Sequence, residues 1–445
     1  MKKILLIVLL QLFALALFLT PADAETVLKL GGGIRAEAET RFDYGNSDTM
    51  RLNRVSQTGL INISASVSKD VKTYIELRSF KGPWASPTVE YAVAVHKANI
   101  AVKNLTLGNC PLFNTIKPLD ITFGRQDIKF GEGIVLNTTM DMLKISSGFS
   151  LLGYDIESMI LYGKGAEGGA YDSPVWKKRQ DINFYGLTSK TKIAENDAAL
   201  GLFILRDYTD KMLFLNSANT RATFLYLDGH ISGSTGFGLK YKGELALQSA
   251  SYLYADTMST GIYGLGLFLE AGYDLSVPVF DKATLACQFA LGTGNDTGKT
   301  GTYTGFASPF EYLYYLPNPD NPVSVSLGEV NIMHPTGSGN AFADNTVVGQ
   351  LMVGKLIARV EPKPYSLEGN IIFVNSVSKK HIISGYVGTE LNLIAGYEFS
   401  NELQFGVIGS MFFAGKDFAF NYGANKNLAA YPAEAMLKTV VNFTF

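Results

Sequence analysis

The chain has 445 residues, of which 47% are hydrophobic, with 45 Gly, 28 Phe and 23 Tyr and a formal net charge of −2 at pH 7. This near-neutral balance excludes nucleic acid as a main partner, because neutralising phosphates requires a basic surface. The apolar content is aromatic and β-forming rather than leucine-rich, which favours an all-β fold.

The N-terminus has the three parts of a secretory signal peptide. MKK is basic, ILLIVLLQLFALALFL is apolar, and TPADA supplies small residues, with Ala22 and Ala24 at the recognition positions. We expect cleavage of residues 1–24, which leaves 25–445 as a single domain. The alternative, a signal anchor, is disfavoured because the apolar run is shorter than the roughly 20 residues that span a bilayer comfortably.

The rest of the chain alternates between apolar and polar residues with period two, as β-strands with two different faces do. RAEAETRFDY, near the start, places charged residues on one face and Ile34, Ala36 and Phe42 on the other. The same pattern recurs in GLINISASVSKDVKTYIELRSF, FGLKYKGELALQ and GTELNLIAGYEFSNELQFGVIGSMFF. Strands of this length are too long for a sandwich, in which strands usually run about five or six residues.

Long alternating strands occur in soluble barrels and in transmembrane barrels, and the connections distinguish the two. Short links such as SKD, GST, EPKP and SNE alternate with long ones, the longest near 295–345. Outer-membrane barrels have short periplasmic turns and long external loops. We therefore predict a transmembrane antiparallel up-and-down barrel of about 18 strands, alternatively 16, with periplasmic termini, in a bacterial outer membrane and in contact with its lipid.

The segment LDITFGRQDIKFGEGIVLN changes the parity of its apolar residues. Leu119, Ile121 and Phe123 face one way, whereas Ile128 and Phe130 have the opposite parity. A bulge over 124–126 would reconcile the two halves. It would also direct into the lumen the charged residues Arg125, Asp127 and Lys129.

The same segment resembles the Gly-Arg-Gln stretch of the alginate export family of outer-membrane barrels. The matching residues are Gly124, Arg125, Gln126, Ile128, Phe130 and Gly131. Glu132 stands where the family more commonly has Asp, and the match extends weakly to ALGTGND and to the closing VGTELNLIAGYEFSNELQFGVIGSMFFAGKDF. The resemblance implies a barrel that exports an anionic polysaccharide such as alginate.

The last nine residues, LKTVVNFTF, form the expected closing strand, which should run from Ala435 to Phe445 and pair with the first strand, Val27 to Tyr44. Val441, Phe443 and Phe445 would face lipid. A terminal aromatic residue on such a strand also resembles the signal that outer-membrane insertion machinery reads.

The charged lumen rows are the candidate functional residues. The basic candidates are Arg35, Arg41, Arg54, Arg78, Arg125, Lys129, Lys144, Lys240 and Lys242. The acidic candidates are Glu37, Glu39, Asp43, Glu76, Asp127, Glu244, Glu270 and Glu398. These rows predict either a basic ladder that grips carboxylate-bearing solutes or a lumen of mutually paired charges. Arg125 is the strongest single candidate, because the bulge and the family pattern both select it.

The long external loop is rich in aromatic residues, namely Tyr303, Phe306, Phe310, Tyr312, Tyr314 and Tyr315. These could stack on sugar rings at the pore mouth, or they could form an interface girdle or pack into the channel. In the loops, Asn295, Asp296, Asp320, Asn321 and Asp344 lack the spacing of a calcium site.

No motif for covalent chemistry occurs. The four histidines have no metal-ligand spacing, and neither Gly-x-Ser-x-Gly nor His-Glu-x-x-His is present. The two cysteines, Cys110 and Cys287, are not expected to form a disulfide. We predict a porin-like channel for polar or anionic solutes without cofactor or metal. The alternatives are a plugged structural or adhesive barrel and a barrel enzyme with adjacent Ser and His at one rim.

Overall fold

The computed structural model describes residues 27–43, 50–81, 92–106, 117–164, 182–207, 220–254, 258–278, 280, 282–293, 302–303, 351–376, 386–414 and 433–445. Its strands are β1 (Val27–Asp43), β2 (Met50–Ser66), β3 (Val71–Lys81), β4 (Ala92–Leu105), β5 (Leu119–Lys129), β6 (Asn137–Leu151), β7 (Tyr154–Lys164), β8 (Ile182–Ile193), β9 (Asn196–Asp207), β10 (Thr220–Ser234), β11 (Leu239–Tyr254), β12 (Met258–Leu275), β13 (Lys282–Gly292), β14 (Thr302–Tyr303), β15 (Leu351–Glu361), β16 (Tyr365–Ser376), β17 (Tyr386–Glu398), β18 (Leu403–Ala414) and β19 (Ala433–Thr444). No helix long and apolar enough to cross a membrane occurs in this part of the chain.

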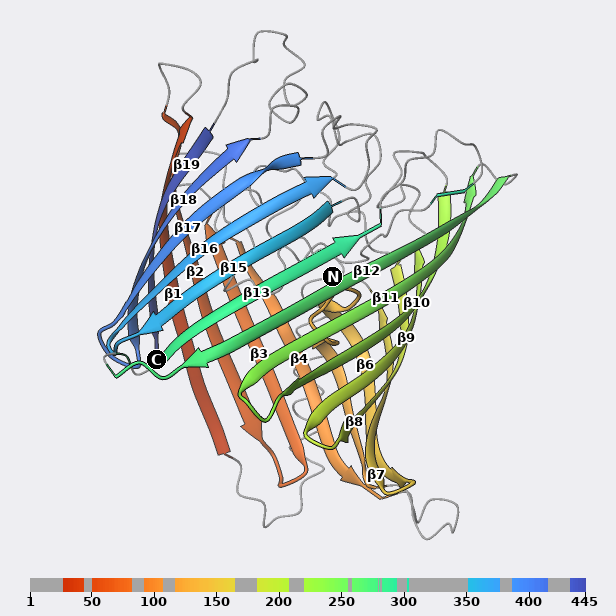
Figure 1. The fold of residues 1–445 in the computed structure, drawn as a ribbon. Helices are drawn as coiled ribbons and strands as arrows, with labels where there is room; N and C mark the ends of the chain where they lie inside the picture. Colours follow the sequence, from red (N-terminus) through yellow and green to blue (C-terminus); the bar gives the residue numbers. More distant parts are fainter. Residues whose placement is uncertain are drawn as a thin grey trace.

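Eighteen of these strands form one closed antiparallel ring, in which each strand pairs with its neighbours in the chain (Figure 1). The remaining strand, β14, has two residues and lies parallel to β12 at Gly261 and Ile262. It does not interrupt the ring, because β13 pairs directly with β15. The predicted count of 18 is therefore confirmed, and the alternative of 16 is wrong.

The ring closes between β1 and β19. Ile34 pairs with Phe443 and Ala36 with Val441, so the outward residues of the two strands are in register. Beyond the last ladder pair, Gly32 and Phe445 exchange two backbone hydrogen bonds of 3.0 Å each. The predicted pairing of the last strand with the first is confirmed, although β19 begins two residues before the predicted Ala435.

The two ends of the barrel differ in their connections, as predicted. Seven of the connections at one end are short, namely 67–70, 152–153, 194–195, 235–238, 276–281, 362–364 and 399–402. The first residue of β1 and the last of β19 lie at this short-turn end. Residues 165–181 and 293–350 connect strands at the opposite, long-loop end. The predicted periplasmic position of the termini follows if the short turns are periplasmic.

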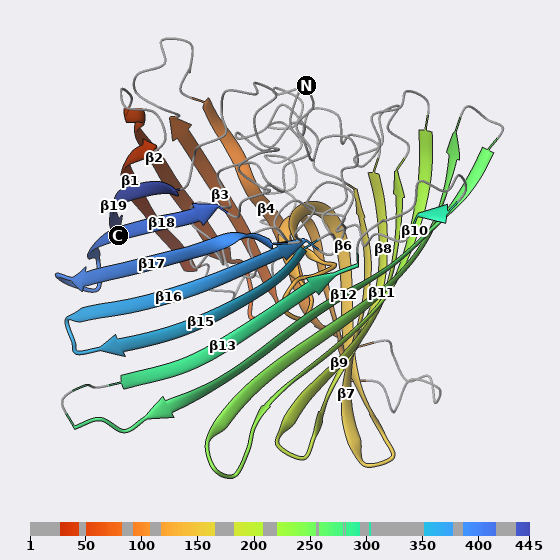
Figure 2. The same cartoon turned by 45° about the horizontal axis from the view of Figure 1, so that its top comes forward.

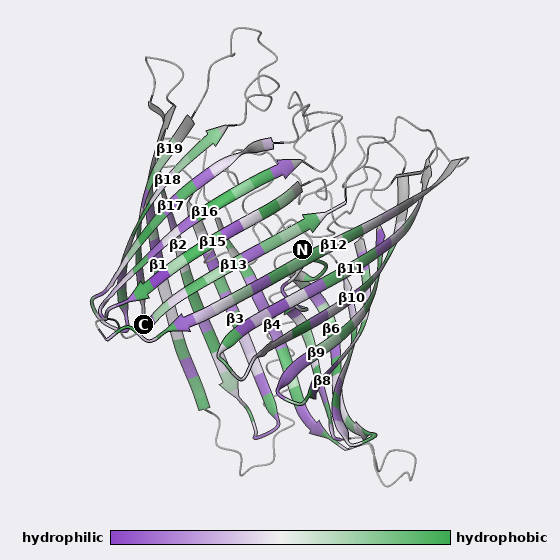
Figure 3. Ribbon diagram, in the orientation of Figure 1, coloured by the Kyte–Doolittle hydropathy of each residue, from purple (hydrophilic) through white to green (hydrophobic). Residues whose placement is uncertain are grey.

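The outer surface of the ring is apolar. Along β7 to β9, Ile160, Leu187 and Leu202 point outward and are exposed, while Leu161 and Phe203 beside them are buried. Hydropathy consequently alternates along most strands (Figure 3). An apolar exterior of this extent is stable in lipid and not in water. The barrel is therefore of the outer-membrane type, and the soluble barrel, which would face its charges outward, is excluded.

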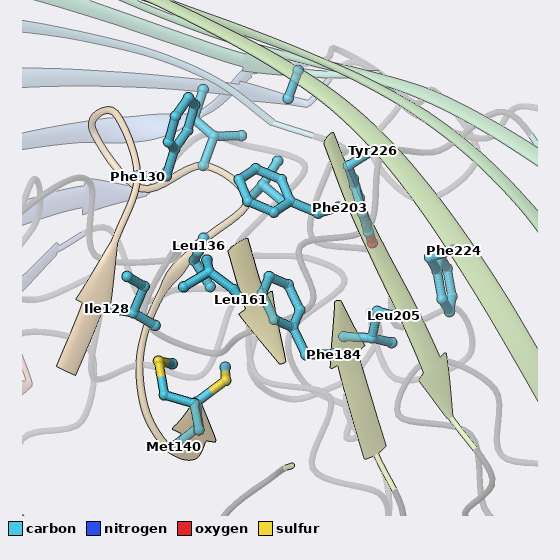
Figure 4. Close-up of a cluster of buried hydrophobic side chains, with 14 of the residues drawn as sticks. Ile128, Phe130, Leu136, Met140, Leu161, Phe184, Phe203, Leu205, Phe224 and Tyr226 are labelled. Atoms are coloured by element: carbon cyan, nitrogen blue, oxygen red, sulfur yellow. The ribbon is translucent and has the colours of Figure 1, made fainter. Parts of the chain in front are cut away.

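The interior has an apolar half, which the sequence analysis did not predict. Residues on the inner faces of β8 to β12 form a buried cluster, shown in part in Figure 4, that includes Phe184, Phe203, Leu205, Phe224, Tyr226, Ala246 and Phe268. Because the outer faces of these strands are apolar too, these strands are apolar on both sides. Such an interior must be covered by other apolar groups, and the segment between β5 and β6 provides them.

Candidate functional site

The segment 130–136 joins β5 to β6 and lies inside the ring of strands, beside β6 (Figure 2). Phe130 N–H donates to the carbonyl of Leu136 at 2.8 Å, which closes the segment into a turn. Phe130, Ile134, Val135 and Leu136 are all buried in the apolar cluster. We call residues 130–136 the inward segment. It narrows the lumen from one side.

Aromatic packing fixes the inward segment against β9. The rings of Phe130 and Phe203 meet edge to face with centroids 5.3 Å apart, and Phe203 stacks on Phe184 at 5.6 Å. Phe203 has no exposed surface, and Figure 4 shows its ring near those of Phe130 and Phe184. Buried aromatic pairs of this geometry add about 0.5–1.5 kcal/mol to the burial of their area.

The carboxylate of Glu244 on β11 holds the tip of the inward segment. It accepts the backbone N–H of Gly133 at 3.1 Å, that of Ile134 at 2.9 Å, and also that of Glu132. Gly131 and Gly133 have φ of +54° and +98°, the left-handed region that favours glycine. A Cβ on Gly131 would lie 2.5 Å from Glu244 Oε2. Successive amides that converge on one acceptor group in this way have the arrangement of a nest.

A network of charges surrounds the other side of the tip. Glu132 Oε1 lies 3.5 Å from His230 Nε2 and 3.7 Å from Lys242 Nζ, and its Oε2 lies 3.7 Å from Lys129 Nζ. Lys242 Nζ also lies 3.5 Å from Glu270 Oε1. Burial raises the pKa of Glu132, but His230, Lys242 and Lys129 outweigh it and hold that pKa below its ordinary value. Glu132 is therefore an anion at neutral pH.

A second charged group lies where β3 and β4 meet the base of the inward segment. Lys97 Nζ lies 2.7 Å from Asp127 Oδ2 and 3.5 Å from Glu76 Oε2. Tyr74 donates to Glu76 at 2.6 Å, and His96 Nε2 lies 3.7 Å from Glu76 Oε1. Glu76 is buried, as a carboxylate can be when it is paired and hydrogen-bonded.

A third polar group lines the inner faces of β15 to β17. Lys355 is buried and faces the carboxylates of Glu368, Glu390 and Glu270. Asn370 Nδ2 donates to Glu368 at 2.9 Å. The lumen thus has an apolar side, covered by the inward segment, and a side lined by alternating acids and bases.

Most of the predicted lumen residues whose side chains are described are paired with opposite charges. Arg35 Nε lies 2.5 Å and Lys438 Nζ 2.9 Å from Glu37, and Lys240 Nζ lies 2.5 Å from Asp274. Two further predicted residues are placed on the inner face by strand register. Lys144 is opposite Leu161 of β7, and Arg78 is opposite Leu60 of β2. The ion pairs of Glu37 and Lys240 favour a lumen of mutually paired charges over a basic ladder.

Three predicted residues can be placed by strand register alone. Glu39 of β1 is opposite Arg54 of β2 and Lys438 of β19, and Arg41 is opposite Met436. Both rows have the parity of Glu37 and therefore belong to the inner face. The side chains of Glu39, Arg41 and Arg54 lie outside the described residues.

The predicted bulge over 124–126 is wrong. The pairing of β5 with β6 runs without interruption from Asp120 to Lys129. Ile128 and Phe130 have the opposite parity to Phe123 because they face the apolar cluster inside the barrel, while Phe123 faces outward with 61% of its surface exposed. The prediction had assumed that every apolar residue of the segment faces lipid.

Arg125 connects β4 with β6 at the point where the backbone pairing of β4 with β5 ends. Without a bulge it follows Phe123 in the outward row, and the pairing of β4 with β5 ends at Ala98 and Arg125. Its Nε and Nη2 each donate to Asp141 at 2.9 Å, and its Nη1 donates to the carbonyl of Val95 at 3.2 Å. Arg125 thus joins β4 to β6 where β5 turns inward. This geometry contradicts the prediction that Arg125 points into the lumen.

Arg125→Lys is therefore expected to destabilise the barrel while leaving ion selectivity unchanged. Lysine cannot form the two-pronged bond to Asp141 and also reach Val95, so a loss of about 1–3 kcal/mol follows. Urea unfolding in lipid vesicles measures the first effect, and the reversal potential in a salt gradient measures the second. A shift in reversal potential at unchanged stability would contradict this position in the barrel wall and would show that Arg125 faces the lumen.

Of the predicted loop aromatics, only Tyr303 lies within the described residues. Tyr303 lies in β14, where its backbone pairs with Ile262 of β12. Phe306, Phe310 and Tyr312, with Tyr314 and Tyr315, lie outside the described residues, as does the predicted signal peptide. Within the described residues no group of three or more His, Cys, Asp or Glu side chains is placed to hold a metal ion.

The aromatic residues of the inner cluster and the role of Glu244 were missed from sequence. A signal for the cluster existed, since AALGLFILR on β9 is apolar at consecutive positions, as strands buried on both faces are. Glu244 was expected in the lumen, but its partners lie 110–112 residues away. Periodicity within a strand does not report contacts at that separation.

Comparisons with known proteins support the fold only. No protein-family model matches the chain, and no curated protein matches it in sequence. Among solved structures, OccK3 (OpdO) of Pseudomonas aeruginosa is similar with a TM-score of 0.53 at 12% identity, over 94% of this chain and 95% of that chain. OprD of Pseudomonas aeruginosa is similar with a TM-score of 0.51 at 10% identity, over 95% and 97%.

Proposed function

We propose that this chain is an outer-membrane channel for the passive passage of polar or anionic solutes. The observation that carries the proposal is a closed ring of 18 strands with an apolar exterior and a lumen lined by ionisable rows. A barrel of this size encloses an aqueous channel unless something fills it. The similar solved structures, which are outer-membrane porins, support the same reading.

Solutes would diffuse past the inward segment without covalent chemistry. The tip is held by Glu244 and lies among Glu132, Lys242 and Lys129, so a passing solute meets both signs of charge at the narrowing. Paired rows orient a solute's dipole and favour neither ion strongly. We accordingly expect weak ion selectivity, with short turns in the periplasm and long loops outside the cell.

Export of an anionic polysaccharide such as alginate is a narrower candidate. It is supported by the resemblance of residues 124–132, of which Gly131 and Glu132 form the tip of the inward segment. An enzymatic role has less support within the described residues, where His96 lies beside Glu76 and His230 lies beside Glu132 and neither of these contacts is with a serine hydroxyl.

The test is single-channel conductance of the refolded mature chain, residues 25–445, in a planar bilayer. Discrete steps with a reversal potential near zero in a tenfold salt gradient are expected. Addition of a soluble anionic polysaccharide should block the current if the narrower candidate is right. If protein shown to be folded by its heat-modifiable gel mobility gave no conductance, the lumen would be filled and the channel proposal would fail.

A further inference from the structure

Asp228 on β10 is a buried carboxyl group to which no donor is bonded. It has the inward parity of Phe224 and Tyr226, its side chain has no exposed surface, and neither of its carboxyl oxygens accepts a hydrogen bond. Gly201 of β9 and Ala246 of β11 are opposite it in the neighbouring strands, and neither has a polar side chain. An ionised carboxylate in such surroundings is costly, because a buried charge needs partners that replace water.

The carboxyl group of Glu244 lies beside that of Asp228. On the inner face the two residues are diagonal neighbours, because Asp228 is opposite Ala246 and Glu244 is opposite His230. Their carboxyl groups are close enough to share a hydrogen, and Glu244 is the charged group that acts on Asp228 among the described residues. Two adjacent buried carboxyl groups repel each other strongly when both are ionised.

The backbone of the inward segment favours the charge on Glu244. Its carboxyl group accepts the N–H groups of Glu132, Gly133 and Ile134, and backbone donors that converge on a carboxyl group stabilise its ionised form. Asp228 accepts no hydrogen bond, so a hydrogen on that residue is free to be donated. The arrangement fits a protonated Asp228 that donates to an ionised Glu244.

The elements packed around the pair bring further ionisable groups to the tip but not to Asp228. On the β9 side, a Cβ on Gly201 would lie 3.1 Å from Phe130 Cζ of the inward segment, so this side is apolar. The ionisable groups near the tip are His230 of β10, Lys242 of β11, Lys129 of β5, Glu132 of the inward segment and Glu270 of β12. The basic groups among them lie 3.5–3.7 Å from Glu132, and His230 also faces Glu244. None of these groups acts on Asp228.

We propose that Asp228 and Glu244 share one proton at neutral pH, carried by Asp228, and that loss of this proton to water in alkaline solution releases the inward segment. While the proton is present, Glu244 is held in place as the acceptor of the segment's backbone N–H groups. Once the proton is lost, two carboxylates face each other in apolar surroundings, and their repulsion drives Glu244 away from the segment. The channel is then narrow near neutral pH and wider in alkaline solution. The widening rests on the proposed channel, whereas the shared proton does not.

Infrared spectroscopy of the refolded mature chain tests the proton directly, in a detergent that has no ester groups. A protonated carboxyl group has a carbonyl band that is separate from the carboxylate bands. We expect this band in the wild type at about pH 8, where ordinary carboxyl groups have ionised, and its loss as the pH is raised further. Asp228→Asn should lack the band. The matched control is Asp274→Asn, which removes an inner-face carboxylate paired with Lys240 and should keep it.

Absence of the band from the wild type, or its persistence in Asp228→Asn, would overturn the shared proton. The pH titration of the wild type needs no variant, so it decides this point even if Asp228→Asn did not refold.

Single-channel conductance tests the release of the inward segment. Between neutral and alkaline pH the steps of the wild type should become larger, and this rise should be absent from Asp228→Asn, whose amide donates to Glu244 at every pH. Lys129, Lys242 and His230 are present in both proteins, so an equal rise in both would assign the response to those groups and overturn the release. An unchanged conductance of the wild type would overturn it too. Absence of any conductance would contradict the channel and its widening together, while the infrared band would still decide on the proton.

Discussion

Glu244→Ala is expected to release the inward segment and enlarge the conductance of the channel. The change removes the acceptor of three backbone N–H groups, from Glu132, Gly133 and Ile134. Buried donors left without an acceptor cost about 1–3 kcal/mol each. Movement of the segment away from β11 restores those hydrogen bonds to water, so the expected response is undocking of the segment rather than unfolding of the ring.

Single-channel recording in a planar bilayer checks this expectation. Glu244→Ala should give larger steps and noisier open states than the wild type. Glu244→Gln, which keeps one acceptor oxygen in the same shape, should be intermediate. Glu361→Ala is the control, since it removes an acid at the short-turn end whose partner is Arg359 at 2.8 Å. Unchanged conductance in a folded Glu244→Ala barrel would show that the inward segment does not limit the current.

The ring itself could be predicted from sequence, because a barrel that spans a membrane has strands with one apolar face and has short turns at one end and long loops at the other. Each strand must present apolar residues to lipid, so its parity is visible in segments such as RAEAETRFDY of β1. Alternation also predicted Glu37 and Lys242 on the inner face, and in the structure Glu37 lies 2.9 Å from Lys438 and Lys242 lies 3.5 Å from Glu270. Period two reports which face a residue occupies, but not what that face contacts.

The candidate site could be predicted only in part, because an apolar residue does not reveal whether it faces lipid or an interior cluster. Ile128 and Phe130 show the difficulty, since their parity is the lumen parity and they are buried within the barrel. We predicted a bulge so that Ile128 and Phe130 would face lipid, and the same bulge placed Arg125 in the lumen. Both predictions are wrong because they assumed that every apolar residue of the segment faces lipid. Gly131, one of the two glycines with positive φ at the tip, was in contrast already present in the motif that singled out this segment.

Phe203→Ala is expected to have the largest effect on stability of any single truncation in the lumen. The side chain is fully buried and packs on both Phe130 and Phe184. Truncation of a buried phenylalanine costs about 3–5 kcal/mol through lost transfer free energy and the cavity that remains. The loss also weakens the docking of the inward segment, so conductance should rise as stability falls.

Leu202→Ala is the matched control, because it removes an apolar side chain from the adjacent position of the same strand. Leu202 points outward with 42% of its surface exposed in the protein alone, and lipid fills any space that its truncation leaves. Urea unfolding of the refolded barrels in lipid vesicles, followed by far-ultraviolet circular dichroism, should show a much smaller loss for Leu202→Ala and no change in conductance. Equal losses for the two variants would mean that the inner cluster contributes no more to stability than contact with lipid does, and that the inward segment is held by Glu244 alone.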